Sequence, residues 1–535
     1  MAPMDVELNL GLLLDHAVRH AAEVEIVTRT GDGSTRRYTY EAFGRRVNQL
    51  MHALDRIGLP AGTTVGTLAW NHDRHLEAYF AIPCSGRVIH TLNPRLGSDD
   101  LAYTVQQADD RVIFVDPDFV PLLDKIPDAL VKVDKIVLMG DRPGDLKTVG
   151  GVETVVSEDL IADEPESYSL REIPERSPAG ICFTSGTTGR PKGVVYSHRG
   201  SVLHAMALTS GAGMMIGPGD CVCAQVPMFH VNCFGLPHAA AAVGAKQVLN
   251  AGSFDPSALV DLFISEEVTF SAGVTTIWQQ VAADLKNRDL RLPHLRRIIN
   301  GGSRPPASLV RTYYAELDIR FLNAFGMTEG TALLAVAVPK PYMKEWDANT
   351  LAERFLPLAG VQMRIAAEDG AELPWDGISA GRLQIRGPWV AASYLGGAGA
   401  DQFTDDGWFD PGDAAIGHAD GYFTFVDRTK DLVKSGGEWI SSADMEEAIT
   451  KMPQVQEAAV IAVPDVKWGE RPMACVVPVE GAAVELAQLA ALLEGSKFPR
   501  WQLPDRMEIL DALPRTSVGK VDKKALRARF ASRDE

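Results

Sequence analysis

Residues 184–193 read TSGTTGRPKG, and this segment is the most informative stretch of the chain. Apolar residues at 181–183 and 194–196 predict a short strand on either side, so we expect the segment to be a loop. Its glycines let a ligand approach the backbone, its hydroxyls can donate to phosphate oxygens, and Lys192 adds a positive charge. The spacing is not that of a Walker motif, and a strand rather than a helix follows. The segment predicts a phosphate-binding loop, with a polar hairpin loop as the alternative.

Strand and helix patterns alternate on the C-terminal side of this loop. Ser197 can cap a helix that runs to about residue 210, and Asp255 can cap another with apolar residues on one face. Apolar runs near 222–226, 247–249 and 295–299 predict strands, and the last of these ends in Gly-Gly-Ser. Alternation of this kind predicts a layered α/β domain whose loops gather at strand ends, where ligands bind.

A smaller unit is expected after the charged segment 427–431. The pattern there predicts a helix at 444–452, strands at 455–463 and 473–479, and a helix at 485–494, which together make a compact α+β unit. We therefore predict a large N-terminal domain, residues 1–430, and a small C-terminal domain, residues 431–535.

Composition excludes several classes of protein. The 535 residues include 52 Lys and Arg against 70 Asp and Glu, and the net charge of −18 argues against nucleic acid as a partner. The N-terminus lacks a signal-peptide pattern, and no apolar stretch reaches the roughly 20 residues that cross a bilayer. Six scattered cysteines are too few for a disulfide framework, and Cys221 and Cys223 fit alternate positions of a strand better than a metal site. A cytoplasmic protein without an integral membrane segment is expected.

The loop at 184–193 resembles the phosphate loop of the acyl-adenylate-forming, or AMP-binding, enzymes. Four further segments match that family in its own order: GGS at 301–303, NAFGMTE at 323–329, GWFDPGD at 407–413 and LPRTSVGK at 513–520. The likeness runs from about residue 30 to residue 525. The usual pattern has other residues where Asp410 and Pro411 stand. The resemblance implies an α/β protein with a large N-terminal domain of layered subdomains and a small mobile α+β C-terminal domain.

The resemblance also implies a nucleotide site that uses ATP and Mg²⁺. Thr184 and Glu329 would bind the metal, and a carboxylate oxygen is the hard ligand that magnesium prefers. Asp413 and Arg428 would hold the ribose. The other residues implied for the nucleotide are Ser185, Gly186, Thr187, Thr188, Lys192, Gly301, Gly302, Ser303, Asn323, Ala324, Phe325, Gly326, Met327 and Thr328.

Lys520 matches the family's catalytic lysine, although a basic tail is the alternative for a lysine near the C-terminus. The chemistry gives the match a physical reason. A substrate carboxylate must attack an anionic α-phosphate, and two unit charges about 4 Å apart repel by about 4 kcal/mol at an effective dielectric near 20. An ammonium that bridges the two anions removes this barrier.

A second step, in which the thiol of CoA displaces AMP, follows from the same resemblance. The small domain would swing about Lys430 and exchange Lys520 for a face that admits the pantetheine arm. That face would contain the segment from Lys434, which we also expect to be catalytic, through Gly436, Gly437, Glu438 and Trp439.

The segment PMFHVNCFG at 227–235 resembles the entrance of the family's acyl pocket, especially in the branch that acts on medium- and long-chain fatty acids. His230 would meet the carboxylate or the adenylate, and Phe234 falls where this branch has an aromatic gate. The remaining residues implied for the acid are Val231, Gly235, Gly302 and Gly326.

The chain is therefore expected to be an acyl-CoA synthetase that converts a carboxylic acid to an acyl-adenylate and then to a CoA thioester. We expect a medium-chain fatty acid, or a short sulfur-containing acid such as 3-methylmercaptopropionate. The resemblance allows a homodimer. The alternatives are an enzyme that loads a carrier protein, a luciferase-like oxygenase, and a non-catalytic acyl- or nucleotide-binding protein.

Overall fold

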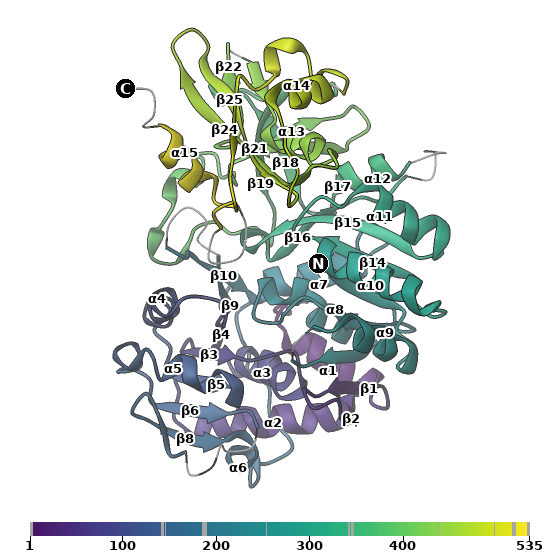
Figure 1. The fold of residues 1–535 in the computed structure, drawn as a ribbon. Coiled ribbons are helices and arrows are strands. Elements are labelled where there is room, and N and C mark those ends of the chain that lie inside the picture. The colour runs from purple at the N-terminus through teal and green to yellow at the C-terminus, as the bar shows by residue number, and fades with distance from the viewer. Residues whose placement is uncertain are drawn as a thin grey trace. The chain divides into compact units, whose positions relative to one another are not determined.

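The structure is a computed structural model that describes residues 4–140, 144, 146–184, 190–252, 254–340, 343, 347–436, 438–496, 498–515 and 521–531. These residues form two compact units (Figure 1). The first unit contains the described residues of 4–184, 190–362 and 386–409, and the second contains those of 363–385 and 410–531. The predicted α/β class is confirmed. Whether 431–535 forms a separate moving domain stays a prediction.

One sheet of the first unit is parallel through its middle and antiparallel at both ends. Its strands follow the order β17-β16-β15-β14-β13-β11-β12-β1-β2. They are β1 (Glu25–Arg29), β2 (Thr35–Thr39), β11 (Cys221–Ala224), β12 (Lys246–Asn250), β13 (Phe270–Val274), β14 (Arg297–Gly301), β15 (Arg320–Met327), β16 (Ala332–Val336) and β17 (Arg354–Pro357).

The other sheet of this unit follows the order β10-β9-β4-β3-β5-β6-β8-β7. All neighbours are parallel except the end pairs β10–β9 and β7–β8. The strands are β3 (Thr64–Leu68), β4 (Val88–Thr91), β5 (Val112–Val115), β6 (Lys135–Leu138), β7 (Thr148–Val149), β8 (Val152–Val156), β9 (Pro178–Phe183) and β10 (Gly193–Ser197).

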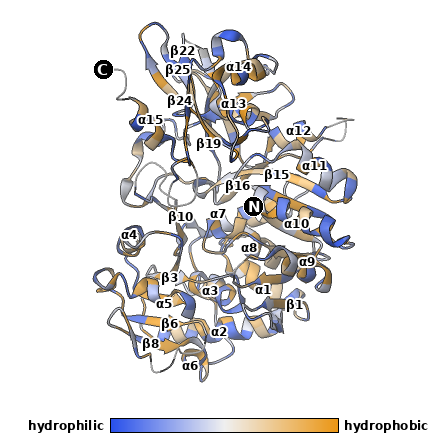
Figure 2. Ribbon diagram, in the orientation of Figure 1, coloured by the Kyte–Doolittle hydropathy of each residue, from blue (hydrophilic) through white to orange (hydrophobic). Residues whose placement is uncertain are grey.

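Helices cover the sheets of the first unit and bury apolar side chains against them. Trp278 of α10 lies fully buried among residues of β14, α9 and α11, and α10 lies against β13 and β14 (Figure 1). Hydrophilic and hydrophobic colours alternate along α2 (Figure 2), as an amphipathic helix requires. The helices are α1 (Gly11–His20), α2 (Tyr40–Arg56), α3 (Asp73–Cys84), α4 (Ser98–Ala108), α5 (Val120–Leu123), α6 (Ser157–Ile161), α7 (His198–Thr209), α8 (Leu236–Val243), α9 (Pro256–Ser265), α10 (Thr275–Arg288), α11 (Ala307–Arg311) and α12 (Ala348–Glu353).

The second unit contains strands in the order β18-β19-β20-β21, of which β19–β20 and β20–β21 are antiparallel. It also contains a mixed sheet in the order β23-β22-β25-β24, in which β26 pairs with β25. Its core lies between the mixed sheet and its helices. The elements are β18 (Gln362–Ala366), β19 (Ala380–Arg386), β20 (Asp413–Gly417), β21 (Phe423–Arg428), β22 (Val433–Ser435), β23 (Glu438–Ile440), α13 (Ser442–Ile449), β24 (Val455–Asp465), β25 (Gly469–Pro478), α14 (Leu486–Glu494), β26 (Arg506–Ile509) and α15 (Lys523–Ala531).

The predicted elements around the phosphate loop are confirmed to within a few residues. Ser197 caps α7 by accepting a hydrogen bond from the backbone N–H of Gly200, and Asp255 caps α9 in the same way through Ala258. Cys221 and Cys223 are buried on β11, as a strand requires. Among the described residues, no helix is long and apolar enough to span a bilayer.

Three buried histidines, His198 and His204 of α7 and His238 of α8, are kept neutral by burial. Burial lowers the pKa of His198 and of His238 to about 4, and burial together with the nearby His238 lowers the pKa of His204 to about 3. The Nε2 atom of His204 accepts a hydrogen bond of 3.1 Å from the backbone N–H of Leu333 in β16. The neutral ring therefore connects α7 to the sheet.

Replacing His204 should reduce the sensitivity of the fold to acid. The pKa of His204 lies near 6.5 in the unfolded chain and near 3 in the folded protein. The neutral ring therefore contributes its full stabilisation of the folded state above about pH 6.5, and this contribution is lost as the pH falls towards 3. When the pH falls from 7 to 5, protonation of His204 in the unfolded state should lower the free energy of unfolding of the wild type by about 2 kcal/mol. His204→Gln keeps an acceptor for Leu333 but does not titrate. Urea titrations at the two pH values should show a smaller loss in the variant; equal losses would contradict the assignment.

Candidate active site

Two hydrogen bonds join Thr184 and Lys192, which lie near the two ends of the expected phosphate loop. The N–H of Thr184 donates to the carbonyl of Lys192 at 2.9 Å, and the N–H of Lys192 donates to the Thr184 hydroxyl at 3.1 Å. Antiparallel pairing of β9 with β10, with Phe183 opposite Gly193, continues this closure. Thr184 and Lys192 therefore lie side by side where β9 ends and β10 begins.

Tyr394, which lies in none of the motifs found in the sequence, contacts both Lys192 and Glu329. The ammonium of Lys192 lies 4.9 Å from the centre of the Tyr394 ring and donates to Oε1 of Gln402 at 2.6 Å. The Tyr394 hydroxyl donates to Oε1 of Glu329 at 2.5 Å. A β-bridge between Tyr394 and Val194 holds the ring beside β10. The structure thus brings the expected phosphate-binding cation and the expected metal-binding carboxylate to one tyrosine.

Glu329 lies on a short 3₁₀ turn, η5 (Thr328–Gly330), directly after β15. The Tyr196 hydroxyl donates to the carbonyl of Thr328 at 2.8 Å, and the N–H of Ala391 donates to the carbonyl of Glu329 at 2.7 Å. Burial, with smaller effects from Cys182 and Glu329, raises the pKa of Tyr196 well above its ordinary value. The phenol therefore remains a hydrogen-bond donor, and the turn is held from both sides.

A bulge in the β15–β16 pair exposes Gly326. The register shifts between Phe325 and Gly326, and a Cβ at Gly326 would lie 1.8 Å from the carbonyl oxygen of Ala332. Only glycine fits there. Phe325 is partly buried, with its ring 6.4 Å from that of Phe355 in an edge arrangement, and Met327 pairs with Ala332. The bulge therefore leaves backbone open where the acid and nucleotide are expected.

Gly302 and Ser303 follow Gly301, the last residue of β14, and form a turn that Asn300 holds. Gly302 has a φ of +84°, and the carboxamide of Asn300 donates to the carbonyl of Ser303 at 2.9 Å. The side chain of Asn323 accepts from Asn300 at 3.0 Å and donates to the carbonyl of Ala352 at 2.7 Å. Asn323 and its neighbour Ala324 are buried in β15. The polar groups of the Asn323 side chain are therefore hydrogen-bonded within the protein and do not face a ligand.

The expected acyl entrance is a left-handed turn, η3 (Val231–Gly235), that follows His230. Val231 to Phe234 all have φ between 46° and 57°, which costs about 1 to 2 kcal/mol for each non-glycine residue. The ring of Phe234 lies so close to Gly301 that a Cβ there would come within 2.8 Å of it. Gly235 packs on the imidazole of His204. The structure therefore brings the aromatic gate and the turn after β14 into contact.

The second unit brings Asp413 and Arg428 together on facing strands. The two residues pair across β20 and β21, with Nε of Arg428 3.0 Å from Oδ1 of Asp413. Asp410, one of the departures from the family pattern, is buried and accepts from Nε of Arg382 at 2.7 Å. Its other oxygen accepts from the N–H of Gly412 at 2.8 Å. Asp410 thus holds the backbone that leads into Asp413.

Lys434 is an exposed residue of β22 whose ammonium contacts the carboxylate of Glu368 and lies 5.8 Å from the centre of the Trp439 ring. Hydrogen bonding to Lys434 lowers the pKa of Glu368. Gly436 has a φ of +62°, and its N–H donates to the carbonyl of Trp468 at 2.8 Å. The backbone of Glu438 pairs with Ser435, so these residues form one hairpin.

Six predicted site residues lie outside the described residues: Ser185, Gly186, Thr187, Thr188, Gly437 and Lys520. Their roles stay predictions. For the first unit, the residues present suit a metal–nucleotide complex. Magnesium needs few protein ligands beside phosphate oxygens, and Glu329 offers one carboxylate oxygen near Lys192. The described residues contain no cluster of three or more His, Cys, Asp or Glu that would hold a metal by protein ligands.

Comparison with known protein families gives two matches. The family model "AMP-binding enzyme" matches residues 14–395, and "AMP-binding enzyme C-terminal domain" matches residues 444–520. The chain is 42% identical to a long-chain-fatty-acid–CoA ligase of Thermus thermophilus over 98% of this chain and 96% of that protein. It is 39% identical to a 3-methylmercaptopropionyl-CoA ligase of Ruegeria lacuscaerulensis over 98% of both. It is 35% identical to a medium-chain-fatty-acid–CoA ligase of Ectopseudomonas oleovorans over 98% of this chain and 96% of that protein.

The chain therefore belongs to the AMP-binding enzyme family. Within it, the chain is an ATP-dependent, AMP-forming acyl-CoA ligase that uses ATP, Mg²⁺ and CoA.

Removing the Tyr394 hydroxyl should weaken the use of magnesium. Tyr394→Phe keeps a ring beside Lys192 but leaves Glu329 without its donor, and loss of such an outer partner typically costs 10- to 100-fold in metal affinity. The Mg²⁺ concentration for half-maximal pyrophosphate release should rise about tenfold. Tyr168→Phe, which removes a hydroxyl bonded to Asp55, is the matched control. An unchanged magnesium requirement in Tyr394→Phe would rule out this role.

Asp410→Ala should raise the KM for ATP about tenfold. The variant loses the ion pair with Arg382 and the hydrogen bond from the N–H of Gly412, which together hold the backbone before Asp413. The KM for the acid should change little. Asp405→Ala, at an exposed position five residues earlier, serves as control. Equal effects of Asp410→Ala on the two KM values would show that Asp410 stabilises the unit as a whole instead.

Proposed function

We propose that this ligase acts on a medium-chain fatty acid or a short sulfur-containing acid such as 3-methylmercaptopropionate. The observation that carries the proposal is the contact of Phe234 with Gly301 at the expected acyl entrance. Residues 231–235 contain no charged side chain, and Val231 and Cys233 are buried, which suits an apolar acyl chain. The relatives' names supply the classes of acid: long-chain and medium-chain fatty acids and 3-methylmercaptopropionate.

The proposed catalytic residues are Lys520, His230, Thr184, Glu329 and Lys434. Lys192 and the loop after Thr184 would bind phosphate oxygens, and Glu329 would hold Mg²⁺, which would neutralise charge on the nucleotide when bound. Lys520 would bridge the substrate carboxylate and the α-phosphate. His230, half-buried at the start of η3, would orient the carboxylate and then the adenylate.

Asp413 and Arg428 would bind the ribose hydroxyls, and their direct contact supports a shared role. Lys434, Gly436 and Trp439 would lie beside the pantetheine arm of CoA in the second step. Positioning and electrostatics are enough for both steps, because the covalent chemistry belongs to the substrates. We further propose, from the family resemblance, a cytoplasmic enzyme that forms a homodimer; light scattering and cell fractionation would test these two points.

Pyrophosphate release with acids from propionate to palmitate, 3-methylmercaptopropionate and aromatic acids tests the proposal. A medium-chain acid or 3-methylmercaptopropionate should give the highest kcat/KM, and product formation should require CoA. Lys520→Ala should lower adenylate formation by roughly 100-fold or more, because it removes the bridging charge. Lys524→Ala, at a nearby basic position, is the control.

A best substrate outside these two classes would overturn the proposed acid. Undiminished adenylate formation in Lys520→Ala would overturn the catalytic assignment. A parallel assay with a phosphopantetheine carrier protein in place of CoA would reveal the carrier-loading alternative if the carrier is acylated faster than CoA.

A further inference from the structure

The turn that follows His230 is strained and therefore needs support from outside itself. Residues 231–234 all have positive φ, which L-amino acids adopt at a cost. Strained backbone of this kind persists only where the surrounding structure holds it. The N–H of His230 donates to the carbonyl of Pro227 at 3.0 Å, and its carbonyl accepts from the N–H of Cys233 at 3.0 Å. A contact that fixes residues 226–233 therefore also fixes the backbone of His230.

One buried side chain, the carboxamide of Asn71, binds the start of this segment at two points. Its Nδ2 donates to the carbonyl of Val226 at 2.9 Å, and its Oδ1 accepts from the N–H of Met228 at 2.6 Å. The thiol of Cys233 donates to the same Val226 carbonyl at 3.0 Å. Burial raises the pKa of this thiol, so the thiol keeps its proton and remains a donor. Asn71 and Cys233 thus tie the two ends of the segment to one carbonyl group.

Helix α3 supplies a second anchor for the same segment. The hydroxyl of Tyr79, a buried residue of α3, donates to the carbonyl of Met228. Burial raises the pKa of Tyr79 well above its ordinary value, so its hydroxyl also remains a donor. Asn71 and Tyr79 together satisfy both backbone polar groups of Met228, as a buried residue requires.

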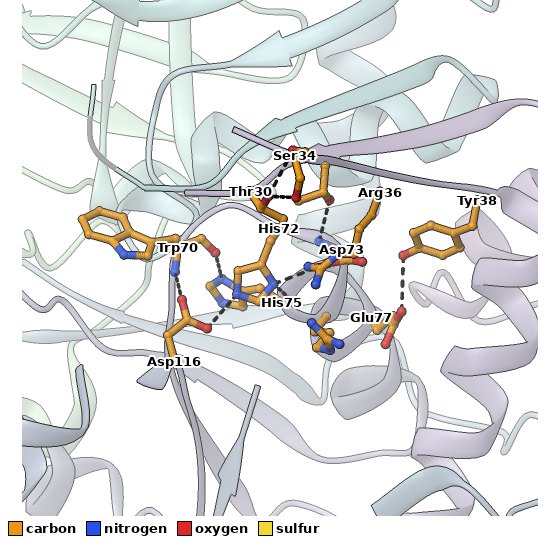
Figure 3. A network of polar contacts seen from close by, with 12 residues as sticks. Thr30, Ser34, Arg36, Tyr38, Trp70, His72, Asp73, His75, Glu77 and Asp116 are labelled. Carbon is orange, nitrogen blue, oxygen red and sulfur yellow. Dashed lines mark hydrogen bonds and ion pairs between the residues drawn. The ribbon is translucent and has the colours of Figure 1, made fainter. Parts of the chain in front are cut away.

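The backbone on both sides of Asn71 is fixed by a buried polar network (Figure 3). Asp116, directly after β5, accepts from the backbone N–H of Trp70 at 2.8 Å and from Nε2 of His72 at 2.8 Å. Nδ1 of His75 donates to the carbonyl of Trp70 at 2.9 Å, and burial lowers the pKa of His75 to about 4. Nδ1 of His72 accepts from the N–H of His75 at 3.2 Å and so caps α3. The carboxamide of Asn71 therefore projects from a rigid stretch of backbone.

We propose that Asn71 is a positioning residue for activation of the acid, because its carboxamide fixes the turn that directs His230 towards the substrate carboxylate. The proposal rests on the role proposed above for His230. Asn71 is only 6% exposed and binds two backbone groups, so it acts through the turn and not on a ligand. A misplacement of about 1 Å in such a site can cost about 100-fold in rate. Lys192 and Glu329 have other partners, so the binding of ATP does not depend on Asn71.

Asn71→Ala tests this role in ATP–pyrophosphate exchange, measured with the acid that the enzyme uses best. The variant loses both hydrogen bonds to the turn, so kcat/KM for the acid should fall about 10- to 100-fold. The KM for ATP should stay within about twofold of the wild-type value. His230→Ala should also lower kcat/KM for the acid. The double variant should be no worse than His230→Ala alone, because Asn71 acts through that side chain.

Asn71→Asp is the conservative variant and supplies a test that does not depend on Asn71→Ala folding. Desolvation raises the pKa of a buried carboxyl group, and the protonated group can still donate to Val226 and accept from Met228. At about pH 6, Asn71→Asp should therefore be more active than Asn71→Ala. Its kcat/KM for the acid, relative to that of the wild type, should fall as the pH rises and the donor is lost.

Gln247→Ala, which removes another buried carboxamide that donates to the Tyr40 hydroxyl at 2.9 Å, is the matched control. It should lower the thermal stability but leave kcat/KM for the acid unchanged. The proposal would be overturned if Asn71→Ala raised the KM values for acid and ATP equally, left kcat/KM unchanged, or added its full loss to that of His230→Ala. Unchanged acid activation in His230→Ala would instead refute the role proposed for His230, so the two failures are distinguishable.

Discussion

The paired hydrogen bonds between Thr184 and Lys192 are the constraint on which the site of the first unit depends. They tie Thr184, directly after β9, to Lys192, directly before β10, and place the Lys192 side chain where it contacts Tyr394 and Gln402. Since β9 is parallel to β4, β3 and β5, the segments that follow those strands emerge at the same edge of the sheet. The Thr184–Lys192 pair therefore lies at the same edge of the sheet as the segments that follow β3, β4 and β5.

Uncharged side chains hold the charged groups of Lys192 and Glu329. Lys192 contacts an aromatic ring and a neutral amide, and the carboxylate of Glu329 accepts a hydrogen bond from a phenol. None of these three groups is charged, so they do not neutralise Lys192 or Glu329. A direct salt bridge would have to be broken before phosphate or magnesium could bind, at the cost of leaving each ion to find a new partner. Tyr394 keeps the two groups near each other and available at once.

Much of this could be predicted from the sequence because the signals are local. Ser197 and Asp255 cap the helices that their positions predicted, and the two strands expected on either side of the glycine-rich segment are present as β9 and β10. Tyr394 lies 65 residues beyond Glu329, outside every motif, so only the fold could bring the two together. Asn323 stands inside a motif, yet its buried amide serves the protein's own backbone. The left-handed turn after His230 could not be predicted either, because Val231 disfavours that conformation and tertiary contacts impose it.

In the second unit, the carboxylate of Asp413 is firmly held, whereas the ammonium of Lys434 has only a weak partner. Asp413 is buried, paired with Arg428 across two strands, and preceded by backbone that Asp410 anchors. Lys434, in contrast, contacts Glu368 in an exposed ion pair, and such pairs contribute about 0 to 1 kcal/mol. A ligand can therefore take Lys434 from Glu368 at little cost, whereas displacing Asp413 would break a buried arrangement. With the proposed roles of Asp413 at the ribose and Lys434 at the pantetheine arm, this difference suits a two-step enzyme.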